Sequence, residues 1–122
     1  LKDYKPAGHG EIWDVATGRF DFSSLSLGDR VLIRYDFIFN ASGTFRELKL
    51  HMELAIGHAN AYTLPVYHAD FKDAGPTPIT GLFLAYMGNT RTLENPAKFT
   101  AQSDGLGDTL GINGWYVETM VR

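Results

Sequence analysis

A run with a period of two constrains the fold of this chain more than any other feature of its sequence. Within residues 45–56, apolar side chains occupy alternate positions and mostly polar residues lie between them; the apolar ones are Leu48, Leu50, Met52, Leu54 and Ile56. A helix would scatter these side chains around its circumference, whereas a strand gathers them on one face. The run therefore predicts a half-buried β-strand, although its Glu, Leu, Lys and Met residues suit a helix on propensity alone.

Seven other segments have the composition of strands, being rich in aromatic and β-branched residues and bounded by turn formers. The eight predicted strands cover residues 11–15, 19–22, 30–40, 45–56, 62–71, 81–87, 97–103 and 115–121. Residues 40–43 contain Asn, Ser and Gly and predict a hairpin that pairs the strands on either side. Residues 73–78 are predicted to form a loop, because their two prolines cannot donate to a strand ladder. Asn113 and Gly114 predict a turn before the last strand.

Eight antiparallel strands in 122 residues predict one all-β domain. We expect a two-sheet jelly-roll sandwich over residues 11–122, preceded by an N-terminal arm over residues 1–10. A closed up-and-down barrel is the rival architecture. The connections are uneven in length, which favours strands that cross between two sheets.

Composition and charge narrow the classes of partner. The chain has 11 basic and 14 acidic residues, a net charge of -3, and no run of Lys or Arg, which argues against a nucleic acid or an anionic membrane surface as partner. No apolar stretch approaches the roughly 20 residues of a membrane span, so we expect no membrane insertion. The absence of cysteine removes disulfides and cysteine-based metal sites. Because the chain begins at Leu1 without a signal-like segment, we expect a fragment or a processed product.

No motif in the sequence points to catalysis. The four histidines lack the closely spaced pair of a cupin-type metal site, and we interpret His51 and Glu53 as a solvated pair on the polar face of their strand. Residues 104–108, Asp-Gly-Leu-Gly-Asp, are interpreted as a turn because they lack the alternating oxygen ligands and terminal Glu of the helix-loop-helix calcium loop. Nucleophile-elbow, phosphate-loop and dinucleotide motifs are absent. We therefore predict no catalytic residue, no metal and no cofactor, and expect the protein not to be an enzyme.

Aromatic residues form 13% of the chain and supply most candidates for the core. The predicted core positions are Trp13, Phe20, Phe22, Phe37 and Phe39, and on the last strand Trp115, Val117, Thr119 and Val121. The run at 81–87 is apolar on both faces, and such a strand needs a partner besides the core. We expect that partner to be another subunit, and assign Tyr62, Phe83, Tyr86 and Met87 to the interface. Residues that bind a ligand are not assigned.

Four stretches carry a resemblance to a known family. Ile12-Trp-Asp14, Thr17-Gly-Arg-Phe-Asp-Phe22, Leu27-Gly-Asp-Arg-Val-Leu-Ile-Arg34 and Asn113-Gly-Trp-Tyr-Val117 resemble the trimeric jelly-roll heads at the tips of bacteriophage fibres and tail needles. These heads are similar in fold to those of tumour necrosis factor and C1q. The resemblance implies a homotrimer that caps an upstream stalk at the tail or fibre tip of a virion and attaches to a glycan or protein receptor on the host surface. Receptor residues of the family lie in variable loops, so none is transferred to this chain.

Two other functions stay open. One is a monomeric carbohydrate-binding sandwich that delivers a hydrolase to its polysaccharide, which would require exposed aromatic residues in a row. The other is a small jelly-roll lyase or isomerase, for which no His pair or activated nucleophile is present.

Overall fold

The computed structural model describes residues 2–3, 12–14 and 16–120 of the chain. Within these ranges the strands are β1 (Lys2–Asp3), β2 (Trp13–Asp14), β3 (Arg19–Phe20), β4 (Arg30–Ala41), β5 (Arg46–Leu54), β6 (Tyr62–Phe71), β7 (Gly75–Tyr86), β8 (Lys98–Ser103) and β9 (Thr109–Met120), with one short helix, α1 (Thr90–Glu94). The predicted all-β sandwich is therefore confirmed. Apart from β1, the predicted arm at 1–10 lies outside the described residues.

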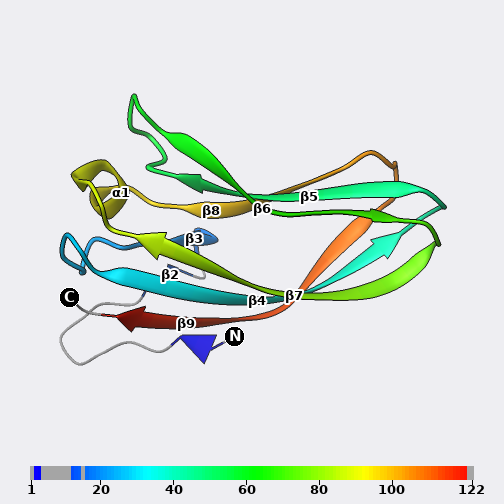
Figure 1. The fold of residues 1–122 in the computed structure, drawn as a ribbon, viewed down its shortest axis with the longest axis horizontal. Coiled ribbons are helices and arrows are strands. Elements are labelled where there is room, and N and C mark those ends of the chain that lie inside the picture. The colour runs from blue at the N-terminus through cyan, green and yellow to red at the C-terminus, as the bar shows by residue number, and fades with distance from the viewer. Residues whose placement is uncertain (1, 4–11, 15, 121–122) are drawn as a thin grey trace.

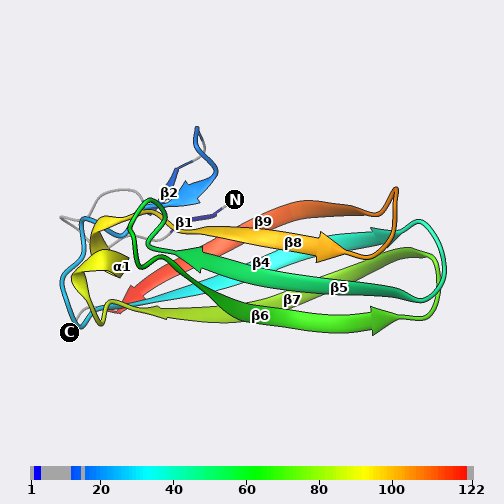
Figure 2. The same ribbon diagram turned by 90° about the horizontal axis from the view of Figure 1, so that it is seen from above.

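Two sheets are packed face to face (Figure 1). A sheet of order β1-β9-β4-β7 covers a sheet of order β6-β5-β8, and β2 and β3 form a separate two-stranded ribbon. The long strands of both sheets run along the same axis of the sandwich (Figure 2). Between β4 and β9, every connection except the one from β5 to β6 changes sheet. This winding is typical of a jelly roll, although β1 runs parallel to β9.

The predicted hairpin at residues 40–43 is wrong. β4 pairs with β7 on one side and with β9 on the other, so it has no free edge for β5. The turn instead carries the chain from one sheet to the other, where β5 pairs with β6 and β8. The sequence signal of the turn is the same in both cases, because it specifies a reversal of direction and not the identity of the partner strand.

The predicted loop at 73–78 and the predicted turn at 113–114 also differ from the structure. β7 begins at Gly75 and includes Pro76 and Pro78, which lie opposite Asn40 and Ile38 of β4. β7 is an edge strand, where a proline can turn its missing donor away from the only ladder. Residues 113–114 lie inside β9, beside a register shift that follows Asp36 of β4. Because a bulge interrupts the regular ladder there, it accommodates these two turn-forming residues within the strand.

The core lies between the inward faces of the two sheets. Strand alternation buries every second residue of β4 and β5, which confirms the period of two in the sequence. Phe20, Phe22, Phe37 and Phe39 are buried as predicted, whereas Trp13 is half-buried and packs against the core. On β9 the predicted inward residues Trp115, Val117 and Thr119 are buried, while Val121 lies outside the described residues. No helix in the described part of the chain is long and apolar enough to span a membrane.

Candidate functional site

Of the four residues predicted for a subunit interface, Met87 belongs to the core and Phe83 packs against it. Met87 is fully buried, and Phe83 is half-buried with its ring centroid 6.2 Å from that of Phe99. Both have odd residue numbers, and the odd-numbered residues of β7, such as Ile79 and Ala85, face inward. The assignment of Met87 to an interface is therefore wrong, because this side chain has no surface left for a neighbouring subunit.

The other two residues lie on different sheets. Tyr62 begins β6, where its hydroxyl lies 2.6 Å from Oγ1 of Thr92 and the guanidinium of Arg91 lies 5.0 Å from its ring centroid. Helix α1 thus covers Tyr62 from within the same chain. Tyr86 ends β7 on the opposite sheet, with 58% of its surface exposed. Tyr62 and Tyr86 therefore do not share one face.

The outward face of β7 carries a continuous row of apolar side chains. Leu82, Leu84 and Tyr86 are between 49% and 62% exposed. Tyr116 of β9 is exposed two strands away in the row of Leu82, with Arg34 of β4 between them. We call these four apolar residues the outer stripe. Leu32 of β4 lies directly opposite Leu84 and extends the stripe toward the middle of the sheet. The sequence predicted two apolar faces for this strand, and the structure assigns the exposed one to the even-numbered residues.

A second exposed apolar group lies at one end of the sandwich. The connections at 42–45, 72–74 and 104–108 gather at the end opposite to the one where β9 finishes (Figure 1). We call these three connections the tip. Phe45 is 74% exposed and Leu106 is 98% exposed. The sequence contains a signal for both, since each is a large apolar residue within a segment of turn formers.

Asp108 fixes the loops of the tip to one another. One carboxylate oxygen accepts hydrogen bonds from the backbone N–H and the hydroxyl of Ser42, at 2.7 and 2.8 Å, and the other accepts one from the hydroxyl of Ser103. Nε of Arg46 lies 3.4 Å from the same carboxylate. The Ser103 hydroxyl, the Ser42 donors and the Arg46 charge together lower the pKa of Asp108 to about 2. The turn interpretation of residues 104–108 agrees with this use of the carboxylate.

Phe45 has an unusual backbone conformation for its residue type. Its φ is +56°, in the left-handed region that glycine and asparagine favour and bulky residues avoid. Its N–H donates to the carbonyl of Lys72 at 3.1 Å, which connects two of the three loops. An exposed phenyl group in a strained backbone position gains little from packing within its own chain. Such positions are concentrated at functional sites.

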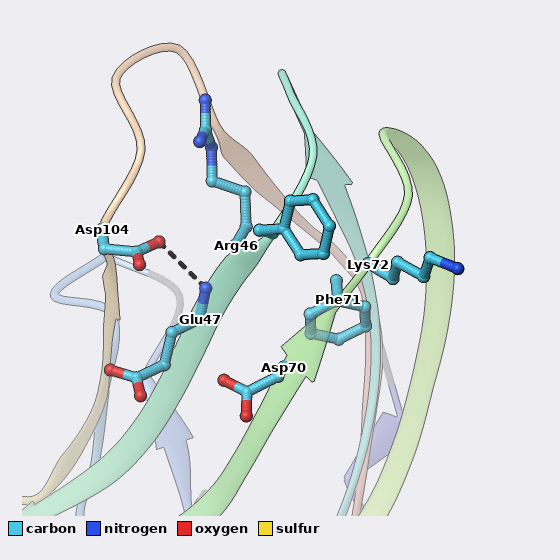
Figure 3. A pocket seen from close by; sticks show the side chains of 7 residues that line it. Arg46, Glu47, Asp70, Phe71, Lys72 and Asp104 are labelled. Carbon is cyan, nitrogen blue, oxygen red and sulfur yellow. Dashed lines mark hydrogen bonds between the residues drawn. The ribbon is translucent and has the colours of Figure 1, made fainter.

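A shallow hollow of about 400 Å³ lies beside the tip. Its lining combines acidic, basic and aromatic side chains: Phe45, Arg46, Glu47, Asp70, Phe71, Lys72 and Asp104. Figure 3 shows that Glu47 comes from β5, Asp70 and Phe71 from the end of β6, and Asp104 from the loop after β8. The N–H of Glu47 donates to Oδ1 of Asp104 at 2.9 Å, which fixes that loop against β5.

The carboxylate of Glu47 also faces two basic groups on the outer side of the sheet. Nε2 of His68 lies 3.0 Å from Oε2 of Glu47, and Nζ of Lys49 lies 3.5 Å from Oε1. The hydrogen bond with His68 is the main cause that lowers the pKa of Glu47. His51 and Glu53 lie on this same polar face, where Glu53 is 3.6 Å from Nζ of Lys98.

Comparison with known proteins adds no relative: the chain matches no family model, no curated protein and no solved structure. The outer stripe, the tip and the hollow are therefore the features of this chain that bear on its function.

Proposed function

We propose that this chain is a non-enzymatic adhesive head that forms a homotrimer and attaches to a host-surface receptor, as part of a phage fibre or tail-associated protein of the virion. One observation carries the proposal: large apolar side chains that do not belong to the core are exposed at two separate places, the outer stripe and the tip. Exposed apolar groups of this kind mark sites of association. We assign the stripe to assembly and the tip to the receptor.

A second copy of the chain suits the outer stripe because β7 presents no charge on this sheet face, whereas β4 and β9 of the same sheet carry charges of both signs. β7 contains no charged residue from Gly75 to Tyr86. The positive charges on these two strands are Arg30 and Arg34 of β4. The negative charges are Asp36 of β4 and Glu118 of β9. Depletion of charge along β7 is typical of an interface core, and the neighbouring charges of both signs can complement those of a rotated copy.

The tip suits a receptor because its apolar groups are displayed on a fixed frame. The Asp108 hydrogen bonds join the loop of Ser42 to that of Leu106, whose carbonyl accepts from the Ser42 hydroxyl at 2.7 Å. Loops held in this way lose less conformational entropy when they bind a partner. They also lie away from the outer stripe, so one molecule can use both surfaces at once (Figure 1).

The assembly half of the proposal is tested by light scattering on three variants. Leu84→Asp and Tyr86→Asp bring three like charges into a poorly solvated interface, so we expect folded monomers of 13.5 kDa where the wild type has three times that mass. Gln102→Asp, an exposed change on the opposite sheet, is the matched control and should keep the trimer. A monomeric wild type, or an unchanged mass in both stripe variants, would show that this face is not an interface.

The attachment half is tested by binding to host cells. Leu106→Asp should abolish binding and leave the trimer intact, since Leu106 is at the tip and makes no contribution to the core. Equal binding by Leu106→Asp and the wild type would remove the tip from the receptor site.

The hollow favours one second candidate, a monomeric carbohydrate-binding module. Aromatic rings stack on sugar rings, and carboxylates accept hydrogen bonds from sugar hydroxyls; Phe45 and Phe71 offer the first, and Glu47, Asp70 and Asp104 the second. Binding of a monomeric wild type to a glycan array, with loss of binding in Phe45→Ser, would favour this function over the trimeric head.

A further inference from the structure

We propose that Glu47, His68 and Asp70 form a binding site for a divalent transition metal ion, Zn²⁺, on the outer face of the β5-β6 pair. One ligand atom from each residue lies within 4.8 Å of the other two. Neither the proposed assembly nor the proposed attachment requires this site, so the inference stands or fails separately.

The strand register explains why the three side chains converge. Glu47 of β5 lies directly opposite Asp70 of β6, and Lys49 lies opposite His68. His68 and Asp70 are two residues apart on one strand and therefore point to the same face of the sheet. Directly opposed residues have Cβ atoms only about 5 Å apart, so side chains as long as these reach a common point above the sheet. The site is thus built on two paired strands and not on a loop.

The hydrogen bonding of the three residues leaves ligand capacity free. Nε2 of His68 lies 3.0 Å from Oε2 of Glu47. This contact already places an imidazole nitrogen beside a carboxylate. The carboxylate of Asp70 makes no side-chain hydrogen bond or ion pair with any residue that the structure describes. Asp70 is exposed and lies next to the His68–Glu47 pair, where a cation would use both carboxylates and the imidazole together.

The chemistry of the donors favours zinc over calcium or magnesium. Imidazole is a good ligand for zinc, whereas calcium and magnesium prefer oxygen ligands only. Three protein ligands with water in the fourth position make an open tetrahedral site. Bonds of about 2.0–2.2 Å place tetrahedral ligand atoms roughly 3.4 Å apart. The ligand atoms now lie within 4.8 Å of one another, so the side chains must rotate to bring them to that separation when a metal binds.

Among the described residues, Lys49 and His68 are the basic side chains that form an ion pair with a proposed carboxylate ligand, and Lys49 opposes a cation here. Arg46 and Lys72 also line the hollow together with the two carboxylates. The Lys49 ammonium lies 3.5 Å from Oε1 of Glu47 and must move away when a metal binds. The Lys49 side chain is 42% exposed, so it is free to turn into solvent. Its removal is therefore expected to strengthen metal binding, which is the opposite of what removal of a ligand does.

The test is calorimetric titration of ZnCl₂ into the full chain, first freed of metal with a chelator. We expect the wild type to bind one Zn²⁺ per chain with micromolar affinity. The affinity for Zn²⁺ should fall at least tenfold in both His68→Ala and Asp70→Asn, and it should rise in Lys49→Met. His51→Ala is the matched control: it removes a histidine from the same sheet face that lies outside the cluster, and its affinity should stay within twofold of wild type. Melting curves in chelator should be the same for all variants, since the altered side chains lie outside the core.

Three results would overturn the proposal: wild-type binding weaker than about 1 mM, equal affinity in His68→Ala and wild type, or a loss in His51→Ala as large as that in His68→Ala. A parallel titration with CaCl₂ separates a zinc site from an acidic patch. Calcium that binds as tightly as zinc, with no effect of His68→Ala, would mean that the carboxylates alone attract cations. Because the outer stripe lies on the other sheet, absence of zinc binding would leave the predicted trimer mass unchanged.

Discussion

Replacement of Trp115 by Ala tests the packing of the core at its aromatic centre. The Trp115 ring is 5% exposed and lies with its centroid 5.0–5.4 Å from those of Trp13, Phe20, Phe37 and Phe99. The Phe99 ring is nearly parallel to it, with an interplanar angle of 11°. Loss of a buried large aromatic side chain costs about 3–5 kcal/mol, and each aromatic pair contributes about 0.5–1.5 kcal/mol beyond its buried area. We expect Trp115→Ala to lose about 3–5 kcal/mol of unfolding free energy.

Urea denaturation followed by circular dichroism measures this loss. With a slope of about 1–3 kcal/mol/M, the midpoint should fall on the order of 2 M. Leu106→Ala is the control, because this side chain is 98% exposed and its truncation should change stability by less than about 0.5 kcal/mol. A loss below roughly 1 kcal/mol in Trp115→Ala would refute the inward orientation of β9.

Trp115→Phe separates the packing of the ring from its polar atom. Nε1 of Trp115 is buried without a hydrogen-bond partner among the described residues, and an unpaired buried donor costs about 1–3 kcal/mol. Phenylalanine keeps a ring beside Phe99 and removes this donor. The loss in Trp115→Phe should therefore be well below that in Trp115→Ala, and equal losses would contradict this account of the cluster.

Three further changes test the edge strand and the tip. Gly81→Ala should cost about 1–3 kcal/mol in urea denaturation, because a Cβ at Gly81 would overlap the hydroxyl and ring of the buried Tyr35; wild-type stability would show that this ring moves freely. Asp108→Asn should destabilise the protein most above pH 4, because the lowered pKa of Asp108 adds stability only while the carboxylate is ionised. The difference in unfolding free energy from wild type should shrink as pH falls from the ordinary pKa of 3.8 toward about 2. A difference that is constant over this range would contradict the role of the charge. Phe45→Gly should leave stability unchanged or raise it by up to about 1 kcal/mol while host-cell binding falls, because glycine removes backbone strain together with the exposed ring; a large loss of stability would mean that the ring packs within the chain.

The candidate surfaces were only partly accessible from the sequence. Because residues 81–87 have two apolar faces, the sequence predicted that one of them lies outside the core. Alternation alone does not say which face meets the core. A one-residue choice of register decides it: the burial of Ile79, Ala85 and Met87 and the packing of Phe83 against Phe99 show that the odd-numbered face is the inward one. The tip and the Glu47–His68–Asp70 cluster join residues from separate segments, and their proximity follows from strand pairing that the sequence does not state.

The class of the fold follows from the sequence alone, because alternation of apolar residues is a local property of each strand. The sequence also predicts the inward residues of β4 and β5, since each of these strands has one face that is clearly more apolar, and the inward residues Trp115, Val117 and Thr119 of β9. The identity of neighbouring strands depends on tertiary packing. A turn such as residues 40–43 reverses the chain equally well within a sheet or between sheets, and the choice depends on β7 and β9 occupying both edges of β4. The prolines at 76 and 78 became part of a strand for the same reason: the position of β7 at the edge of its sheet leaves one side of its backbone without a ladder to complete.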